Sequence, residues 1–361
     1  MRNTGIPFVI YGASGYTGRR IAREAAGRGL RPLLAGRSRE KLEPLAAELG
    51  CEWRAFALES PAQIARELAG SAAVLNCAGP FSATAAQTMD ACIEARVNYL
   101  DITGEIDVIE AAAARSVRAR DAGVTLLPAV GFDVVPTDCL AAALAEEMPD
   151  AQTLQLAFMS SGKMSPGTAK TMIESAPGGG RARIEGKIVK VPIGWKAMEV
   201  PFRNGKRWAV TIPWGDVASA YYSTGIPNIE VYTAVPAARI ASLRRWRFLA
   251  PLSGFGPVQS WLKRRIERKV RGPSDDELAA SRASLWGSAT DSEGRSAEAT
   301  LETPGGYPLT VLCALAAVMR VLAGGLAPGF STPSGAFGRD FILEIPGTDF
   351  RFESMQENPA S

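Results

Sequence analysis

Short apolar stretches alternate with helical patterns through residues 1–133. The stretches PFVIYG, RPLLAG, CEWRAFAL, AAVLNCAG, VNYLDI and GVTLLPAV each have the length and composition of a buried strand. Between them we expect helices at about residues 17–28, 83–95 and 105–121, and two others that Ser38 and Ser60 can cap. Six apolar strands separated by helices predict a parallel, doubly wound α/β sheet, in which ligands lie at the carboxyl ends of the strands.

The first predicted strand runs into a glycine-rich turn, YGASGYTG. Its glycines have the spacing G-x-x-G-x-x-G and stand directly before a helix. Glycine lets such a turn fold tightly, and backbone N–H groups at the helix N-terminus can then approach a pyrophosphate. We therefore predict a dinucleotide-binding Rossmann domain; a tight turn without a ligand is the alternative. The predicted cofactor contacts in this turn are Gly12, Ser14, Gly15, Tyr16, Thr17 and Gly18.

The end of the second strand indicates which dinucleotide binds. A site for NAD carries an acidic residue there, whereas this chain reads LLAGRSREKL and has Arg37 and Ser38. A guanidinium can bind a 2′-phosphate, which a carboxylate would repel, so the sequence favours NADP(H) over NAD(H). A solvated surface arginine is the alternative. After the fourth strand, NCAGPF supplies a second set of predicted cofactor contacts, namely Asn76, Ala78, Gly79 and Pro80.

Beyond residue 133 the pattern changes. Strand-like pieces such as TLQLAFMSS, KRWAVTIPW and IPNIEVYTAVP are separated by glycine and proline. They predict a C-terminal α+β substrate domain over residues 134–361, with a mixed or antiparallel sheet. The apolar helix expected at about residues 308–323 can pack back onto the NADP-binding domain of residues 1–133.

Composition excludes several classes of protein. The net charge of +3 gives no reason to expect nucleic acid binding. Five scattered cysteines without a CxxC pair, and no histidine, predict reduced thiols in the cytoplasm and no metal site. No signal-peptide pattern is present, and the apolar run LTVLCALAAVM is too short to span a bilayer. We expect a soluble cytoplasmic protein, with peripheral membrane association left open.

The absent residues also restrict the chemistry. The string GASGYTG is similar to that of N-acetyl-glutamyl-phosphate and aspartate-semialdehyde dehydrogenases, but their cysteine nucleophile needs a histidine that this chain lacks. No tyrosine is followed four positions later by lysine, which excludes the short-chain dehydrogenase pattern. Zinc-dependent dehydrogenase chemistry is excluded as well, because this chain has no histidine and no paired cysteines to bind zinc. What remains is a reductase in which the nicotinamide supplies the hydride and Tyr, Lys, Asp or water supplies one proton.

Several strings carry a family resemblance. With YGASGYTG, LLAGRS, NCAGPF, NYLDITGE and GFDVVPTD in this order, the chain resembles the saccharopine dehydrogenase-like oxidoreductases, and within them the bacterial trans-acting enoyl reductases. SPGTAKTMIES, VTIPWGDVASAYYSTGIPNIEVY and PGFSTPSGAFGRDFILEIPG extend the resemblance over nearly the whole length. It implies an N-terminal NADP(H)-binding Rossmann domain and a C-terminal domain that shapes the substrate pocket. It also implies that residues 101–105 and 131–133 lie near the nicotinamide.

Four residues are candidates for a catalytic role. Tyr221 and Tyr222 stand in WGDVASAYYSTG and would point to opposite faces if that segment were extended, so only one could face a pocket. Packing in the core is the alternative for both. Asp133 follows the sixth strand and either acts in the site or caps the next helix. Lys163 either serves the site or is an ordinary solvated lysine.

The segment 239–271 differs from its surroundings, because it holds ten Lys or Arg and one acidic residue. Aromatic residues interleave with these charges, and Leu262, Ile266 and Val270 fall on one helical face. This composition is typical of a helix that lies on an anionic membrane. A surface for an acyl-carrier partner and a plain solvated helix are the alternatives. A homodimer is also left open.

Together these observations predict an NADPH-dependent oxidoreductase that reduces an activated C=C bond in a small acyl or lipid-like substrate. One alternative is a saccharopine-type C=N reductase of an amino-acid adduct. For that alternative, Lys163, Lys170, Arg181 and Arg183 could bind substrate carboxylates. The other alternative is a non-catalytic NADP(H)-binding protein that docks on a membrane or a partner.

Overall fold

The computed structural model describes residues 8–161, 176–246, 255–269 and 272–353. The chain divides into two compact units. The first comprises Met1–Val135 and Leu309–Ala336, and the second comprises Pro136–Pro308 and Phe337–Ser361. The first unit therefore combines two stretches of chain that are separated by most of the second.

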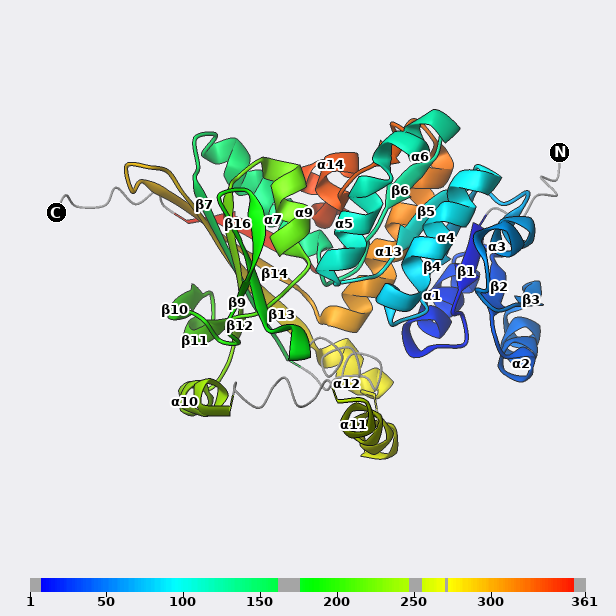
Figure 1. The fold of residues 1–361 in the computed structure, drawn as a ribbon, viewed down its shortest axis with the longest axis horizontal. Helices are drawn as coiled ribbons and strands as arrows, with labels where there is room; N and C mark the ends of the chain where they lie inside the picture. Colours follow the sequence, from blue (N-terminus) through cyan, green and yellow to red (C-terminus); the bar gives the residue numbers. More distant parts are fainter. Residues whose placement is uncertain (1–7, 162–175, 247–254, 270–271, 354–361) are drawn as a thin grey trace. The chain divides into compact units, whose positions relative to one another are not determined.

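A parallel sheet forms the centre of the first unit (Figure 1). Within the described residues its strand order is β15-β6-β5-β4-β1-β2-β3. The strands are β1 (Phe8–Tyr11), β2 (Leu33–Gly36), β3 (Trp53–Ala55), β4 (Ala73–Asn76), β5 (Asn98–Asp101), β6 (Thr125–Leu127) and β15 (Gly329–Phe330). The order 3-2-1-4-5-6 is that of a Rossmann fold, so the doubly wound prediction is confirmed. Strand β15, which pairs in parallel with β6, comes from the C-terminal stretch and was not predicted.

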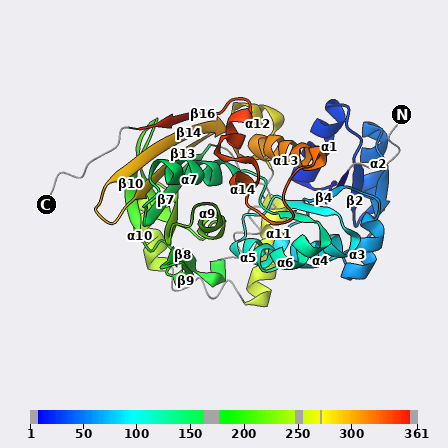
Figure 2. The ribbon, with the colours of Figure 1, turned by 90° about the horizontal axis from the view of Figure 1, so that it is seen from above.

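Helices cover both faces of this sheet. Those following the strands are α1 (Tyr16–Gly27), α2 (Arg39–Leu49), α3 (Pro61–Leu68), α4 (Phe81–Ala95), α5 (Ile106–Ala114) and α6 (Ser116–Ala122), and the C-terminal stretch adds α13 (Gly306–Ala323). Figure 2 shows α1 and α13 on one face and α3 to α6 on the other. Gly50 ends α2 in the left-handed conformation, as a C-terminal glycine does. The expected helix over 105–121 is two helices, α5 and α6.

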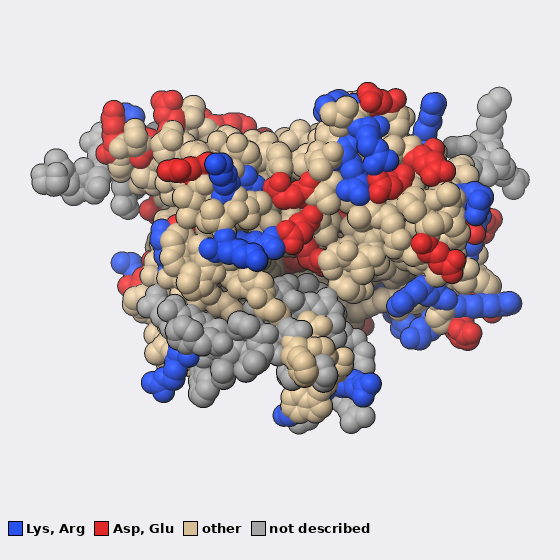
Figure 3. Space-filling model, viewed as in Figure 1, with Lys and Arg blue, Asp and Glu red and all other residues tan. Residues whose placement is uncertain are grey.

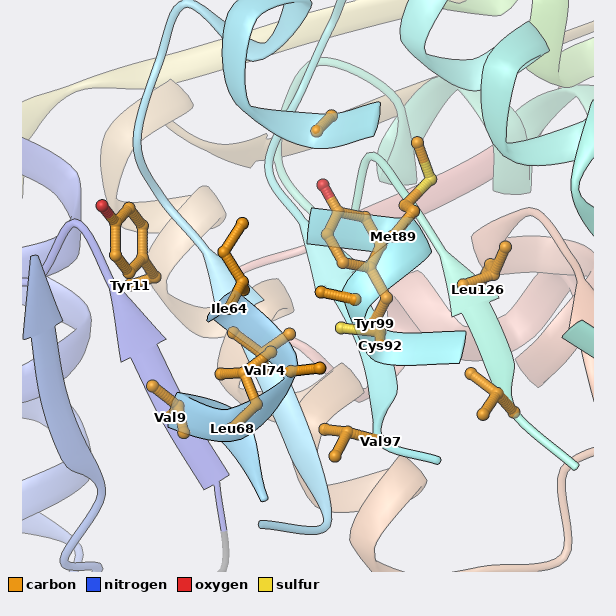
Figure 4. Close-up of a cluster of buried hydrophobic side chains, with 14 of the residues drawn as sticks. Val9, Tyr11, Ile64, Leu68, Val74, Met89, Cys92, Val97, Tyr99 and Leu126 are labelled. Atoms are coloured by element: carbon orange, nitrogen blue, oxygen red, sulfur yellow. The ribbon is translucent and has the colours of Figure 1, made fainter. Parts of the chain in front are cut away.

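One hydrophobic core lies between the sheet and α3 to α6 (Figure 4). Val9, Val74 and Leu126 project from three strands and are fully buried. Alternate residues of the same strands, such as Ile10 and Leu75, are also fully buried. Burial of both strand faces is characteristic of a parallel sheet, and it explains why these strands read as continuous apolar runs in the sequence.

The second unit is built on a mixed sheet, which confirms the predicted α+β class. Its main strand order is β10-β11-β12-β7-β13-β14-β16, where β12 and β7 are parallel and the other pairs antiparallel. The strands are β7 (Thr153–Ser160), β8 (Gly180–Ile184), β9 (Lys187–Val191), β10 (Ala197–Phe202), β11 (Gly205–Thr211), β12 (Asn228–Ala234), β13 (Arg282–Thr290), β14 (Ser296–Pro304) and β16 (Asp349–Phe352). Helix α7 (Val135–Glu147) packs on β13, because a Cβ added at Gly287 would lie 2.7 Å from Leu144 Cδ1.

Two helices differ from the sequence-based expectations. Residues Asp216–Thr224, considered above as extended chain, form helix α9, which ends at a left-handed Gly225. Helix α13 continues through Arg320 to Ala323, and it is the one helix among the described residues that is long and apolar enough to cross a membrane. Leu309, Cys313 and Leu315 are nevertheless fully buried, as expected of a core helix.

Candidate dinucleotide and proton-donor site

The glycine turn between β1 and α1 packs against the loop that follows β4. Gly12 has a φ of +83°, and a Cβ added there would lie 2.9 Å from the backbone nitrogen of Ala78. A Cβ added at Gly18 would lie 2.3 Å from the carbonyl oxygen of Gly12. Only glycine fits these two positions, because backbone atoms cannot move aside as flexible side chains do. The turn therefore has the close backbone packing that brings N–H groups up to a pyrophosphate.

The N-termini of α1 and α4 differ in a way that indicates which one binds an anion. Gly15 precedes α1, no side chain caps this helix, and its first turn contains no acidic residue. By contrast, the Glu105 carboxylate accepts hydrogen bonds from the backbone nitrogens of Phe81 and Ser82, each at 2.8 Å. The positive end of α4 is thus already matched by a carboxylate, whereas the end of α1 suits a phosphate. The predicted contacts Ser14, Tyr16 and Thr17 lie at or beside this end of α1.

The Asn76 side chain fixes the loop after β4 through hydrogen bonds. This side chain is fully buried, and its Oδ1 accepts a hydrogen bond from the backbone nitrogen of Ala78 at 3.0 Å. Its Nδ2 donates to Thr84 Oγ1 at 3.2 Å and to the Tyr99 hydroxyl at 3.4 Å. The Asn76 side chain is therefore engaged with the protein and shapes the loop. The residues left to approach the dinucleotide are Ala78, Gly79 and Pro80, which are partly or fully exposed.

Arg37 follows β2 directly and is exposed. Within the part of the chain that the structure describes, no ion-pair partner of Arg37 is present. Ser38 stands at the N-cap of α2 but does not cap it with its side chain; its hydroxyl donates instead to Glu40 Oε2 at 2.8 Å. An unpaired guanidinium at the end of β2 fits a 2′-phosphate.

Replacing Arg37 with Ala is expected to weaken NADPH binding by about 10- to 100-fold, the loss of one charge-assisted interaction with the 2′-phosphate. Binding of NADH, which lacks that phosphate, should change less than about twofold. Titration calorimetry with both dinucleotides measures the two effects. The control is Arg39→Ala, two residues further on, whose guanidinium pairs with Glu43 at 3.3 Å. Equal losses for NADPH and NADH would contradict the assignment.

A second polar group lies at the carboxyl end of β5. Asp101 is fully buried, and its Oδ1 accepts hydrogen bonds from the backbone nitrogens of Thr103 at 3.0 Å and Ala129 at 2.8 Å. Its Oδ2 accepts one from the Tyr99 hydroxyl at 2.7 Å. Burial raises the pKa of Asp101 to about 6. The Asp101 carboxylate therefore accepts three hydrogen bonds from the protein itself. It links the loops after β5 and β6 and has a structural role.

Asp133 is arranged differently. It lies in the loop after β6, where a Cβ added at Gly104 would be 2.7 Å from its Oδ2, so the carboxylate rests against the backbone of the β5–α5 loop. Burial and the neighbouring charge of Glu105 raise the pKa of Asp133 to about 7. Among the described residues its carboxylate makes no hydrogen bond, so the alternative of capping α7 is not what the structure has. Asp133 is therefore a carboxyl group that can carry a proton at neutral pH.

Helix α13 fixes the loop that carries Asp133. The backbone nitrogen of Phe132 donates a hydrogen bond to Thr310 Oγ1 at 3.0 Å. A Cβ added at Gly131 would lie 3.0 Å from Thr310 Cγ2, so the loop backbone and the helix are in close contact. The apolar pattern of this helix indicated that it could pack onto the NADP-binding domain, but not which residues meet, because Thr310 lies 178 positions after Phe132.

The remaining catalytic candidates belong to the second unit or lie outside the described residues. Tyr221 packs under the Arg183 guanidinium, 4.2 Å from the ring centroid, and α9 holds it there. Tyr222 is 42% exposed, and its ring meets that of Tyr221 edge-on at 5.9 Å. In a helix these neighbours are not on opposite faces, so the extended geometry considered above is wrong. Lys163 lies outside the described residues.

Cys77 stands directly after β4, in the loop that packs against the glycine turn. Burial, which is the larger cause, and the charge of Asp101 raise the pKa of its thiol. The thiol therefore stays protonated at neutral pH, and a thiol is a poor nucleophile compared with a thiolate. This agrees with the exclusion of cysteine-based dehydrogenase chemistry.

Comparison with known proteins gives a match to a family model and matches to curated relatives. Residues 8–127 match the family model described as the saccharopine dehydrogenase NADP binding domain. The saccharopine dehydrogenase-like oxidoreductase of Homo sapiens is 31% identical over 155 residues, covering 36% of this chain and 35% of that protein. The trans-acting enoyl reductase of Mycobacterium bovis is 32% identical over 144 residues, covering 36% of this chain and 33% of that protein.

Among solved structures, apo saccharopine dehydrogenase (L-Glu forming) from Saccharomyces cerevisiae is similar with a TM-score of 0.67 and 12% identity, covering 96% of this chain and 99% of that one. This likeness concerns the fold. The chain spans about a third of the length of these curated relatives. The family resemblance and the nicotinamide dinucleotide cofactor are thereby confirmed.

Proposed function

We propose that this chain, whose residues 8–127 belong to the saccharopine dehydrogenase NADP-binding domain family, is an NADPH-dependent reductase of an activated C=C bond in an acyl or lipid-like substrate. The dinucleotide would be held by the turn of Gly12, Gly15 and Gly18, by the N-terminus of α1 and by Arg37. Bound NADPH would supply a hydride, that is, a proton with two electrons, for the electrophilic carbon.

The second hydrogen must arrive as a proton, and Asp133 supplies it in this proposal. The single observation that carries it is the placement of Asp133 at the carboxyl edge of the sheet, in the same compact unit as the glycine turn. A general acid works best when its pKa is near the operating pH, and burial with the charge of Glu105 brings the pKa of Asp133 to about 7. After each turnover the Asp133 carboxylate takes up a proton from solvent.

The environment of Arg183 supports an acyl substrate over an amino-acid adduct. A saccharopine-type substrate carries several carboxylates and needs basic groups to bind them. Arg183 is buried, and its Nε donates to the Val217 carbonyl while its Nη1 donates to the Gly186 carbonyl, each at 2.8 Å. Its guanidinium also covers the Tyr221 ring. One of the basic residues considered for that alternative is thus committed to holding the β8–β9 turn and α9.

The test is the loss of NADPH absorbance with purified protein and two substrates offered in parallel. One is a medium-chain trans-2-enoyl thioester, and the other is 2-oxoglutarate with lysine. We expect turnover of the thioester alone, with mass spectrometry showing a product heavier by two hydrogens. Turnover of the amino-acid pair alone would replace the proposal with the C=N reductase. Tight NADPH binding without turnover of either would favour the non-catalytic alternative.

A further inference from the structure

We propose that helix α11 (Gly256–Lys269), together with Phe255 before it, is a docking surface for an anionic phospholipid membrane. The docking surface is defined by Phe255, Trp261, Arg264 and Arg265. The proposal concerns where the protein binds and does not depend on the reaction proposed above. It makes a peripheral membrane location an expected property of the protein.

The docking surface exposes large aromatic side chains. Phe255 is 64% exposed and Trp261 is 57% exposed. A single exposed apolar residue on a protein surface is ordinary, but two aromatic residues on one short segment form a local site that water solvates poorly. Tryptophan and phenylalanine suit the boundary between lipid headgroups and acyl chains, where the ring leaves water.

Arginines accompany these aromatic residues on the helix. Arg264 and Arg265 are exposed, and they follow Trp261 by three and four positions, so all three side chains share one helical face. The guanidinium of Arg265 lies over the Trp261 ring, 5.4 Å from its centroid. An arginine stacked on an interfacial tryptophan presents its charge at headgroup level while the ring enters the membrane.

The charge of the whole segment favours an anionic partner. Residues 239–271 have a net charge of +9, whereas the complete chain has +3, so the rest of the chain is negative. The exposed Arg239 and Arg245 of helix α10 (Ala237–Trp246) add to the positive charge, and Figure 3 shows described arginines of α10 and α11 in blue at its lower edge. An anionic surface would therefore attract residues 239–271 and repel the negatively charged rest of the chain. The protein would thus approach the membrane with this segment first.

The occupant we assign is a lipid surface because the basic residues are interleaved with exposed aromatic residues. Charge alone would fit any anion. The combination of a basic face with interfacial aromatic residues is the composition of a helix that lies in the plane of a membrane. An acidic protein partner is the competing occupant. If the docking surface served such a partner instead, the protein would not bind to lipid vesicles.

The experiment is co-sedimentation of the full chain with vesicles of phosphatidylcholine, with and without phosphatidylglycerol. We expect binding to the anionic vesicles only, and a decrease as salt rises. The double variant Arg264→Glu/Arg265→Glu should lower the partition coefficient by at least about 30-fold, given the contribution of each basic residue near an anionic surface. Trp261→Ala should lower it as well, and a blue shift of tryptophan emission on adding vesicles should shrink in Trp261→Phe.

Matched controls exist elsewhere in the second unit. Trp208 on β11 is 40% exposed, and the adjacent Lys206 and Arg207 are exposed as well. Trp208→Ala and Lys206→Glu/Arg207→Glu remove the same kinds of group and should leave vesicle binding unchanged. The proposal is overturned if the unaltered protein does not bind anionic vesicles, or if the control variants lose as much binding as the α11 variants. Because no turnover is measured, this outcome is separate from the fate of the proposed reaction.

Discussion

Asp133→Asn is expected to lower kcat for thioester reduction by about 100- to 10,000-fold, the usual contribution of a positioned general acid. NADPH binding should stay within about twofold of its original value, because the glycine turn and Arg37 are untouched. Stopped-flow measurement of NADPH oxidation and calorimetry of NADPH binding separate the two quantities. The control is Asp107→Asn, an exposed carboxylate in the first turn of α5.

The pH dependence provides a sharper readout of the same residue. Since Asp133 acts in its protonated form and its pKa is raised to about 7, kcat should be constant below that pH and fall above it. The descending limb should disappear in Asp133→Asn. Weak activity that still falls above pH 7 in this variant would assign the proton donation to another group.

Stability should respond to the same substitution in the opposite sense. A carboxyl whose folded-state pKa is raised from 3.8 to about 7 favours the fold while protonated, and this contribution is lost as pH rises toward and through the folded pKa. Asn cannot ionise, so the gain in Tm from Asp133→Asn should be smallest at pH 3.8 and below, grow between pH 3.8 and about 7, and be largest above pH 7. A gain in stability with a loss of activity is the outcome expected if this half-buried carboxyl group acts as the general acid.

Gly18→Ala is expected to weaken NADPH binding by about 10- to 100-fold and to lower the free energy of unfolding by about 1–3 kcal/mol. The added methyl would meet the Gly12 carbonyl oxygen at 2.3 Å, so the turn has to open where backbone N–H groups approach the pyrophosphate. Calorimetry of NADPH binding and urea denaturation measure the two effects.

Helix α1 itself offers a matched control for that substitution. Gly27 ends α1, and nothing lies within 4 Å of a Cβ added there. Gly27→Ala should bind NADPH as the original protein does and be equally or slightly more stable, since alanine favours a helix over glycine. If Gly18→Ala bound NADPH normally, the turn would not be the pyrophosphate site.

The predicted and the observed secondary structure agree best in the first unit. Its strands are buried on both faces, and this produces the continuous apolar runs that identify them in the sequence. The turn at Gly12 and Gly18, the left-handed Gly50 and the position of Arg37 are local features, determined by residues close together in the chain. Patterns of this kind also gave the mixed sheet of the second unit, through its separated strand-like pieces.

Other features depend on residues far apart in the chain. Helix α9 was not predicted, because its short run of small, hydroxyl and aromatic residues suits either a helix or a strand, and packing in the second unit selects the helix. Glu105 reaches across to the N-terminus of α4, and Thr310 holds the loop of Asp133 from 178 positions beyond Phe132. No local pattern contains these contacts.

There is a physical reason why some features could be predicted from the sequence and others only seen in the tertiary structure. The sequence by itself determined which segments form the nucleotide-binding sheet and where its phosphate turn lies, because hydrophobic periodicity and backbone conformation act over a few residues. Only the tertiary structure showed how the surroundings of the two carboxyl groups at these strand ends differ. Asp101 and Asp133 are the same residue type at neighbouring strand ends, but three hydrogen bonds satisfy Asp101, while burial beside Glu105 raises the pKa of Asp133 to about 7.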